Sequence, residues 1–238
     1  MATGPNQRYM TRTDTAAAGI DAGLRQYMLR VYNYMTGGLA LTGVVAYIVS
    51  NNEAMMQAIY GTPLAWVVML APVGIAMLFG FGINRMSAGT AQIVFWIFAA
   101  VMGLSLSYIF VAYTGASIAR VFFITAGTFA AMSLYGYTTS RDLTGFGSFL
   151  IMGLIGLIIA SVVNIFLASS ALDFAISVIG VLIFTGLTAY DTQRIKSSYS
   201  EADDHQIGTK KAVMGALSLY LDFINLFLML LRLFGNRN

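Results

Sequence analysis

The sequence contains no cysteine. This absence excludes disulfides, thiol-attached haem, thiolate zinc sites and a cysteine nucleophile. There is also only one histidine, His205, which follows Asp203 and Asp204 in a polar stretch at 192–211. An Asp-Asp-His cluster could ligate a metal, but a single histidine in a charged loop is more often solvated. We therefore expect no resident metal in this stretch.

Charged residues are scarce as well. They make up 10% of the 238 residues, against about 25% in a soluble domain, while 58% of the chain is hydrophobic. A membrane-spanning helix needs about 20 apolar residues, so this composition indicates an integral membrane protein with no room for a soluble catalytic domain. The expected fold class is an all-α, polytopic bundle of seven transmembrane helices. The spans are predicted at 28–50, 63–84, 91–113, 117–137, 146–168, 174–195 and 212–233.

The domain organisation follows from these spans. Residues 1–26 are rich in Thr, Ala and Gly and short of large apolar side chains, so we expect a flexible N-terminal tail. Residues 27–238 form the seven-helix domain. Proline occurs three times, and Pro72 is expected to kink the second span because it removes a backbone donor.

The few basic residues are unevenly distributed, and the net charge of +3 fits orientation in a membrane better than nucleic-acid binding. Cytoplasmic loops carry an excess of Lys and Arg, so the N-terminus is expected in the cytoplasm and the C-terminus outside. Ten basic residues fall on the cytoplasmic side (Arg8, Arg12, Arg25, Arg30, Arg85, Arg141, Arg194, Lys196, Lys210 and Lys211) and three on the other (Arg120, Arg232 and Arg237).

Two aspartates lie inside apolar sequence. Asp191 ends the sixth span, and Asp222 has apolar or small residues on both sides for about nine positions. A carboxylate near the bilayer centre costs about 2.5 to 3.5 kcal/mol on insertion scales, so such residues usually face a bundle interior and mark an ion or proton path. Asp191 has a second interpretation, as a helix-end carboxylate paired with Arg194 three residues later.

The sixth and seventh spans form a helical hairpin, which makes Asp191 the obvious partner for Asp222. Two carboxyl groups within hydrogen-bond reach would share a proton. At 1.5 Å per residue, however, Asp191 lies about 27 Å from Asp173, whereas Asp222 lies only about 20 Å from Gly235. Contact therefore requires a tilted seventh helix or one displaced toward the cytoplasm.

Other polar groups near the spans have mainly structural interpretations. Arg85, Arg120 and Arg232 lie near span ends and could snorkel to the interface or supply a countercharge to the aspartates. Asn164 and Asn225 are expected to hydrogen-bond between helices.

Two runs carry a family resemblance. They are Phe184-Thr-Gly-Leu-Thr-Ala-Tyr-Asp191-Thr-Gln-Arg-Ile-Lys196 and Gly215-Ala-Leu-Ser-Leu-Tyr-Leu-Asp222-Phe-Ile-Asn-Leu-Phe-Leu, followed by Leu231-Arg-Leu-Phe-Gly235. Together with the run Tyr135-Gly-Tyr-Thr-Thr-Ser-Arg-Asp142, they closely resemble the Bax-inhibitor-motif family, which includes Bax inhibitor-1 and bacterial inner-membrane proteins. The resemblance covers nearly the whole chain after the tail.

This resemblance implies a last helix that is central and wrapped by the other six. It also implies a hydrogen-bonded, pH-sensitive pair of Asp191 and Asp222 at a pore, and a calcium leak across the bacterial inner membrane. Arg232 matches an arginine that pairs with an acid in the second span of some relatives, but 54–84 contains no acid. Arg85 is the best match for an arginine that latches the aspartate pair.

Three functions are compatible with these residues. The first is a pH-gated cation leak in which Asp191 and Asp222 bind calcium weakly and transiently, since hard cations prefer oxygen ligands. The second, an intramembrane aspartyl protease, is disfavoured because Leu219-Tyr-Leu-Asp222 replaces the Gly-x-Gly-Asp that such enzymes need. The third is a non-transporting regulator that binds other membrane proteins. We expect no enzyme activity, no cofactor and no nucleic-acid partner.

Overall fold

The computed structural model describes the backbone of residues 5–238 and the side chains from residue 22 onward. Every regular element in this part of the chain is helical, which confirms the all-α class; one isolated bridge joins Tyr113 and Arg237. The helices are α1 (Pro5–Ser50), α2 (Glu53–Tyr60), α3 (Leu64–Gly82), η1 (Ile83–Arg85), α4 (Ala88–Leu106), α5 (Ile109–Ala112), α6 (Gly115–Thr138), α7 (Thr144–Leu167), α8 (Ser170–Ser197) and α9 (His205–Phe234).

Among the described residues, six helical segments are long and apolar enough to cross a membrane. They correspond to the second to seventh predicted spans, whereas the first, at 28–50, is not among them. That segment is the C-terminal half of α1, where Asn33, Thr36, Gly37 and Gly38 reduce the apolar character. The structure therefore supports six spans, and the count of seven stays a prediction.

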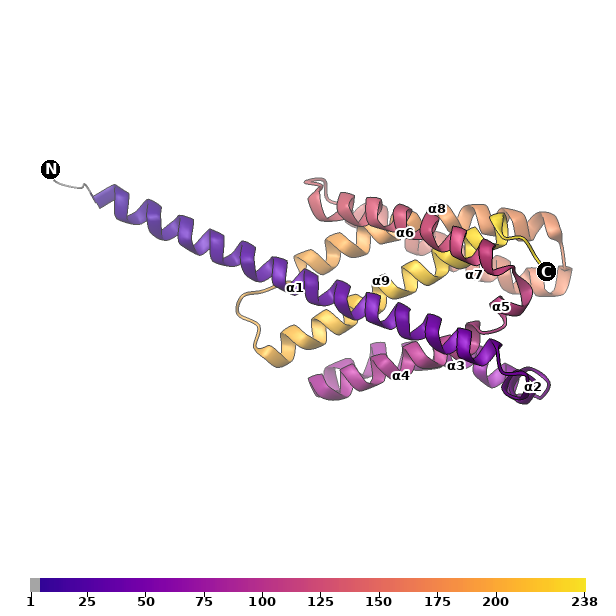
Figure 1. Cartoon of the computed structure of the whole chain (residues 1–238). Coiled ribbons are helices and arrows are strands. Elements are labelled where there is room, and N and C mark those ends of the chain that lie inside the picture. Colours follow the sequence, from indigo (N-terminus) through magenta and orange to yellow (C-terminus); the bar gives the residue numbers. More distant parts are fainter. Residues whose placement is uncertain (1–4) are drawn as a thin grey trace.

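The N-terminal tail has more regular structure than its composition indicated. α1 begins at Pro5 and continues without a break into the bundle, so residues 5–26 are helical, and α1 projects beyond the other helices (Figure 1). An alanine run at 16–18 and the absence of proline from residues 6–50 favour this extension. Residues 1–4 of the predicted tail lie outside the described residues.

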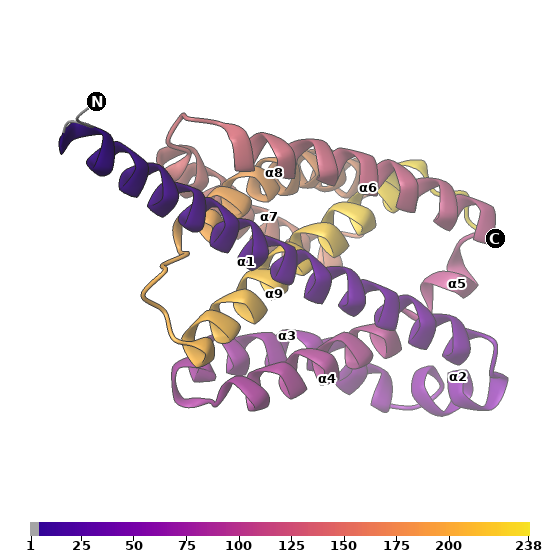
Figure 2. The ribbon, with the colours of Figure 1, turned by 60° about the vertical axis from the view of Figure 1, so that its left-hand side comes forward.

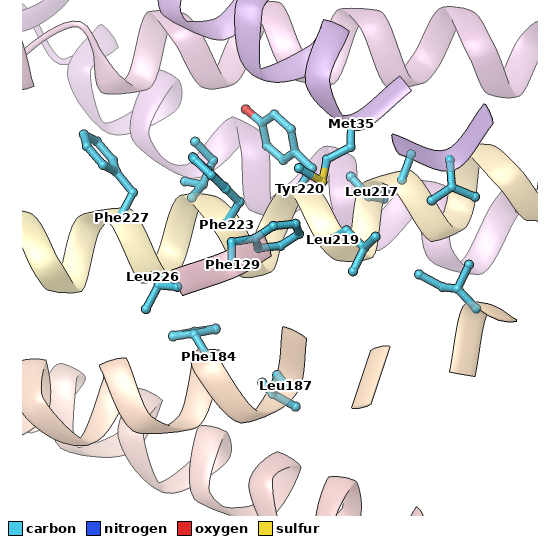
Figure 3. Close-up of a cluster of buried hydrophobic side chains, with 14 of the residues drawn as sticks. Met35, Phe129, Phe184, Leu187, Leu217, Leu219, Tyr220, Phe223, Leu226 and Phe227 are labelled. Atoms are coloured by element: carbon cyan, nitrogen blue, oxygen red, sulfur yellow. The ribbon is translucent and has the colours of Figure 1, made fainter. Parts of the chain in front are cut away.

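Helix α9 forms the centre of the bundle. It crosses the other helices obliquely, and its main neighbours are α1, α4, α6 and α8 (Figures 1 and 2). Figure 3 shows Leu226 of α9 facing Phe184 of α8, and Tyr220 beside Met35 of α1. The last helix is thus central as expected, but α3 packs mainly on α4 and α7 mainly on α8.

A buried polar contact fixes α9 against two of its neighbours. The Tyr220 hydroxyl lies 2.6 Å from Oγ1 of Thr42, which itself donates a hydrogen bond to the Ala99 carbonyl at 2.8 Å. The buried hydroxyl groups of Tyr220 and Thr42 thus both have hydrogen-bond partners, as burial requires. The contact joins α9 to α1 and α4.

The polar stretch between the last two spans is mostly helical rather than a loop. α8 continues to Ser197 and α9 begins at His205. Asp204 caps α9 by accepting a 2.7 Å hydrogen bond from the Ile207 amide, and Asp203 pairs with Lys211 at 2.6 Å. Both acids of the Asp-Asp-His cluster therefore have structural roles.

The contact between α6 and α8 depends on a glycine. A Cβ atom at Gly136 would overlap the carbonyl oxygen of Ala189, whereas one at Gly127 on the same helix would meet nothing within 4 Å. Absence of a side chain at Gly136 thus permits close backbone approach, the usual way in which membrane helices pack tightly.

We expect Gly136→Ala to destabilise the protein by about 1 to 3 kcal/mol, because the backbone of α8 must move to avoid the new methyl group. Gly127→Ala should leave stability unchanged or raise it by about 0.5 to 1 kcal/mol, since alanine favours a helix more than glycine does. Thermal unfolding of both variants in the same detergent measures the difference. Equal melting temperatures would contradict this account of the α6–α8 contact.

Candidate functional site

A cavity of about 660 Å³ lies on one side of α9, with walls from α3, α4, α7 and α8. The structure places both sequence-predicted aspartates on it, Asp191 from α8 and Asp222 from α9. Most of the other lining residues are apolar. The polar and charged lining residues are Ser161, Asp191, Arg194, Ser218, Asp222 and Asn225.

The geometry of α9 explains why the two aspartates line the same cavity. α9 begins at His205, seven residues before the predicted span, and it crosses the bundle obliquely (Figure 2). A tilt of the last helix is one of the two conditions under which the depth count allows contact. Both aspartates accordingly line the same cavity.

Asp222 is buried and incompletely paired. Only 5% of the residue is exposed, and its Oδ2 atom has no hydrogen-bond partner. A buried carboxylate without donors is unfavourable unless it is protonated or meets a cation. Among the residues that the structure describes, the charged groups that line the cavity with it are Asp191 and Arg194.

Asp191 pairs with an arginine of its own helix. Nη2 of Arg194 lies 3.3 Å from Oδ1 of Asp191, and the same nitrogen donates to Oγ of Ser218 at 3.2 Å. The guanidinium also lies 5.7 Å from the centre of the Tyr190 ring. Arg194 therefore links α8 to α9 at the cavity wall.

The hydrogen bond between the carboxyl groups of Asp191 and Asp222 that the family resemblance implies stays a prediction. Asp191 is engaged by Arg194, and the Oδ2 atom of Asp222 has no partner among the described residues. The two groups share a cavity, close enough for their charges to interact. Asp191 thus forms the helix-end ion pair with Arg194 and also lines the cavity that contains Asp222.

Neither predicted latch arginine contacts the aspartates. Nη1 of Arg232 lies 3.6 Å from Oδ1 of Asp173, and both side chains are about half exposed. Asp173 is in the first turn of α8, about 27 Å along the helix from Asp191. Arg85 is exposed in η1 and forms no ion pair with a described residue. Arg194 is instead the arginine that contacts Asp191.

Asn225 bonds within its own helix, and Asn164 bonds to the turn that follows its helix. Asn225 donates to the Leu221 carbonyl at 2.8 Å. Asn164 accepts from the Ser169 amide at 3.0 Å, closing the end of α7 where Ala168 adopts a left-handed conformation with φ 48°. Asn164 therefore serves as a helix terminator, while Asn225 also lines the cavity.

Oxygen atoms dominate the polar part of the cavity. The carboxylates of Asp191 and Asp222, the Ser218 hydroxyl and the Asn225 amide are hard ligands of the kind that calcium and protons prefer. Within the described residues, no group of three or more His, Asp and Glu side chains could hold a metal ion. The arrangement suits proton exchange and transient cation contact.

The sequence analysis did not assign Arg194 and Ser218 to the site. Signals for both existed in the helical period. Ser218 lies four residues before Asp222 and Arg194 three residues after Asp191, so each shares a helix face with its aspartate. Hydropathy registers the apolar residues around Asp222 and does not single out Ser218 or Arg194.

Comparisons with known proteins agree with the resemblance noted in the sequence. Residues 24–238 match the family model described as "Inhibitor of apoptosis-promoting Bax1". An uncharacterized protein of Rickettsia prowazekii is 56% identical over 217 residues, covering 91% of this chain and 92% of its own. The inner membrane protein YbhL of Escherichia coli is 49% identical over 219 residues, covering 91% and 94%. With six helices suited to a bilayer, the chain belongs to the Bax inhibitor family of membrane proteins.

Proposed function

We propose that the protein is a pH-sensitive cation leak channel, with calcium as the main permeant ion. The observation that carries the proposal is the cavity in which Asp191 and Asp222 lie together, with one carboxylate oxygen unpaired. Ionisable groups at membrane depth usually mark ion or proton pathways. The two carboxyl groups share a proton and so couple cation passage to pH.

The ligand set favours weak binding of a hard cation. Two carboxylates with an amide and a hydroxyl provide oxygen ligands, fewer than the six to eight that hold calcium firmly. A site of this kind releases the ion readily, as conduction requires. It therefore suits passage rather than storage.

Arg194 is the cation that competes for this site. Its guanidinium bonds to Asp191 and Ser218, and its charge reaches Asp222. When a proton neutralises Asp191, the ion pair is lost and the guanidinium is held by Ser218 and the Tyr190 ring alone. The proposed latch is therefore Arg194, in place of the predicted Arg85 and Arg232.

The location proposed for the chain is the bacterial inner membrane, which the name of the YbhL relative states for that protein. The N-terminus is placed in the cytoplasm and the C-terminus outside, in accordance with the excess of basic residues on one side. The beginning of α1 and the C-terminus lie at opposite ends of the molecule (Figure 1). Enzyme activity and a cofactor are not part of the proposal.

We expect Asp191→Asn and Asp222→Asn each to flatten the pH dependence of calcium influx, because each removes one of the two titrating carboxyl groups. The measurement is calcium entry into dye-loaded liposomes that contain the purified protein, scanned over about pH 5 to 8, where perturbed carboxyl pairs titrate. Wild-type protein should show pH-dependent flux above that of empty liposomes.

Asp173→Asn is the matched control, since Asp173 is an acid of the same helix that pairs with Arg232 away from the cavity. This variant should retain the wild-type profile. Unchanged pH dependence in both cavity variants would disprove the gate. Absence of wild-type flux at every pH would instead support the regulator that binds other membrane proteins.

We expect Arg194→Gln to shift the flux–pH curve toward higher pH by about one unit, because the ionised Asp191 carboxylate loses the cation beside it. Lys196→Gln removes the same charge from the same helix, but Lys196 faces Tyr137 of α6. The liposome measurement applied to both variants separates a local from a general charge effect. Equal shifts in both would argue against Arg194 as the latch.

A further inference from the structure

A second and larger hollow lies between α1 and α6, on the side of α9 where Phe223 points. It is a groove of about 1100 Å³, lined almost wholly by apolar side chains and open along its length. Figure 2 shows α1 and α6 along this side of the molecule, with α9 visible between them. Asp191 and Asp222 are not among its lining residues, so it is separate from the site described above.

Small and flexible residues create the groove. Ala126 and Ala130 of α6 face Ala40 and Gly43 of α1, and a Cβ atom at Gly43 would meet nothing within 4 Å. Met28 and Met35 line the same space, and methionine adapts its shape to varied apolar ligands. Larger residues at these positions would have closed the gap.

Two polar side chains that line the groove, Tyr32 and Ser133, bond to other groups of the protein. The Tyr32 hydroxyl bonds to the Ser133 hydroxyl across the groove, and Ser133 lies 3.0 Å from Oγ1 of Thr192. An occupant therefore needs no polar group at this depth. From Met28 to Val44 the groove extends about 24 Å along α1, a large part of the roughly 30 Å hydrocarbon thickness of a bilayer.

One end of the groove is cationic. α1 and α6 run antiparallel across it, so Arg25 and Tyr137 lie beyond Tyr32 and Ser133 at the same end. Lys196 donates from Nζ to the Tyr137 carbonyl at 2.7 Å and keeps two further donors. Basic residues at the end of a crevice between membrane helices form the usual recognition site for an anionic lipid headgroup.

We propose that this groove binds an anionic phospholipid, with one acyl chain along α1 and α6 and the phosphate beside Arg25 and Lys196. An unfilled groove would leave its walls without dispersion contacts, and lipid chains are the apolar molecules that surround it. The charge at one end selects the headgroup. The proposal does not rest on cation transport, because the groove and the cavity of Asp191 and Asp222 have different lining residues.

Native mass spectrometry of the purified protein tests the proposal, with phosphatidylglycerol or phosphatidylcholine of equal chain length added in detergent. Wild-type protein should retain one phosphatidylglycerol, with phosphatidylcholine several-fold weaker. Ala130→Trp should abolish retention because the indole fills the groove. Arg25→Gln should weaken the binding of phosphatidylglycerol by about fivefold, which corresponds to the loss of one basic contact with an anionic lipid. The binding of phosphatidylcholine should stay unchanged.

Ala131→Trp is the matched control, since Ala131 is the next residue of α6 and exposed outside the groove. It should retain lipid as the wild type does. Equal binding by all variants would show ordinary surrounding lipid only and overturn the proposal. A dimer that Ala130→Trp converts to monomer would overturn it too, because a second copy would then be the occupant. Circular dichroism confirms that each variant is folded, and Arg25→Gln provides the test if Ala130→Trp is not.

Discussion

The carboxyl group of Asp222 imposes the main constraint on this structure. It lies on α9 among apolar residues, where lipid cannot solvate it, and insertion of such a group costs about 2.5 to 3.5 kcal/mol. α9 is accordingly the most buried helix, with α1, α4, α6 and α8 packed around it. The remaining space near Asp222 is a cavity rather than a close-packed core, and Asp191 and Arg194 also line it. The central position of α9 and the presence of the cavity thus have one cause.

The position of Asp191 depends on two glycines that pack against the two residues before it in the sequence. A side chain at Gly136 of α6 would overlap Ala189, and one at Gly147 of α7 would overlap the Tyr190 ring. These contacts hold α8 from both sides one and two residues before Asp191. Small residues permit such close approach in lipid, where packing rather than water exclusion drives association. The charge pair of the site is therefore positioned by residues that carry no charge.

The sequence was informative where apolar length and charge decide the structure, and less so where helix ends and tilt decide it. Six of the predicted spans are present in the structure, and Asp191 and Asp222 line the same cavity. The polar stretch at 192–211 is largely helical because Asp204 caps α9 and basic residues end α8, which hydropathy does not register. The sequence indicates Arg194 as a local partner of Asp191, because it follows three residues later. Its bond to Ser218 depends instead on how α8 and α9 cross.

The two hollows of the molecule meet at α9. Phe223 lines the groove between α1 and α6, while Asp222, the preceding residue, lines the cavity between α3, α7 and α8. Successive residues of a helix point about 100° apart, so a rotation of α9 changes both surfaces together. The bond between Tyr220 and Thr42 opposes that rotation by tying α9 to α1, one wall of the groove. The shape of the groove and the setting of the Asp222 carboxyl are consequently coupled through a single rigid helix.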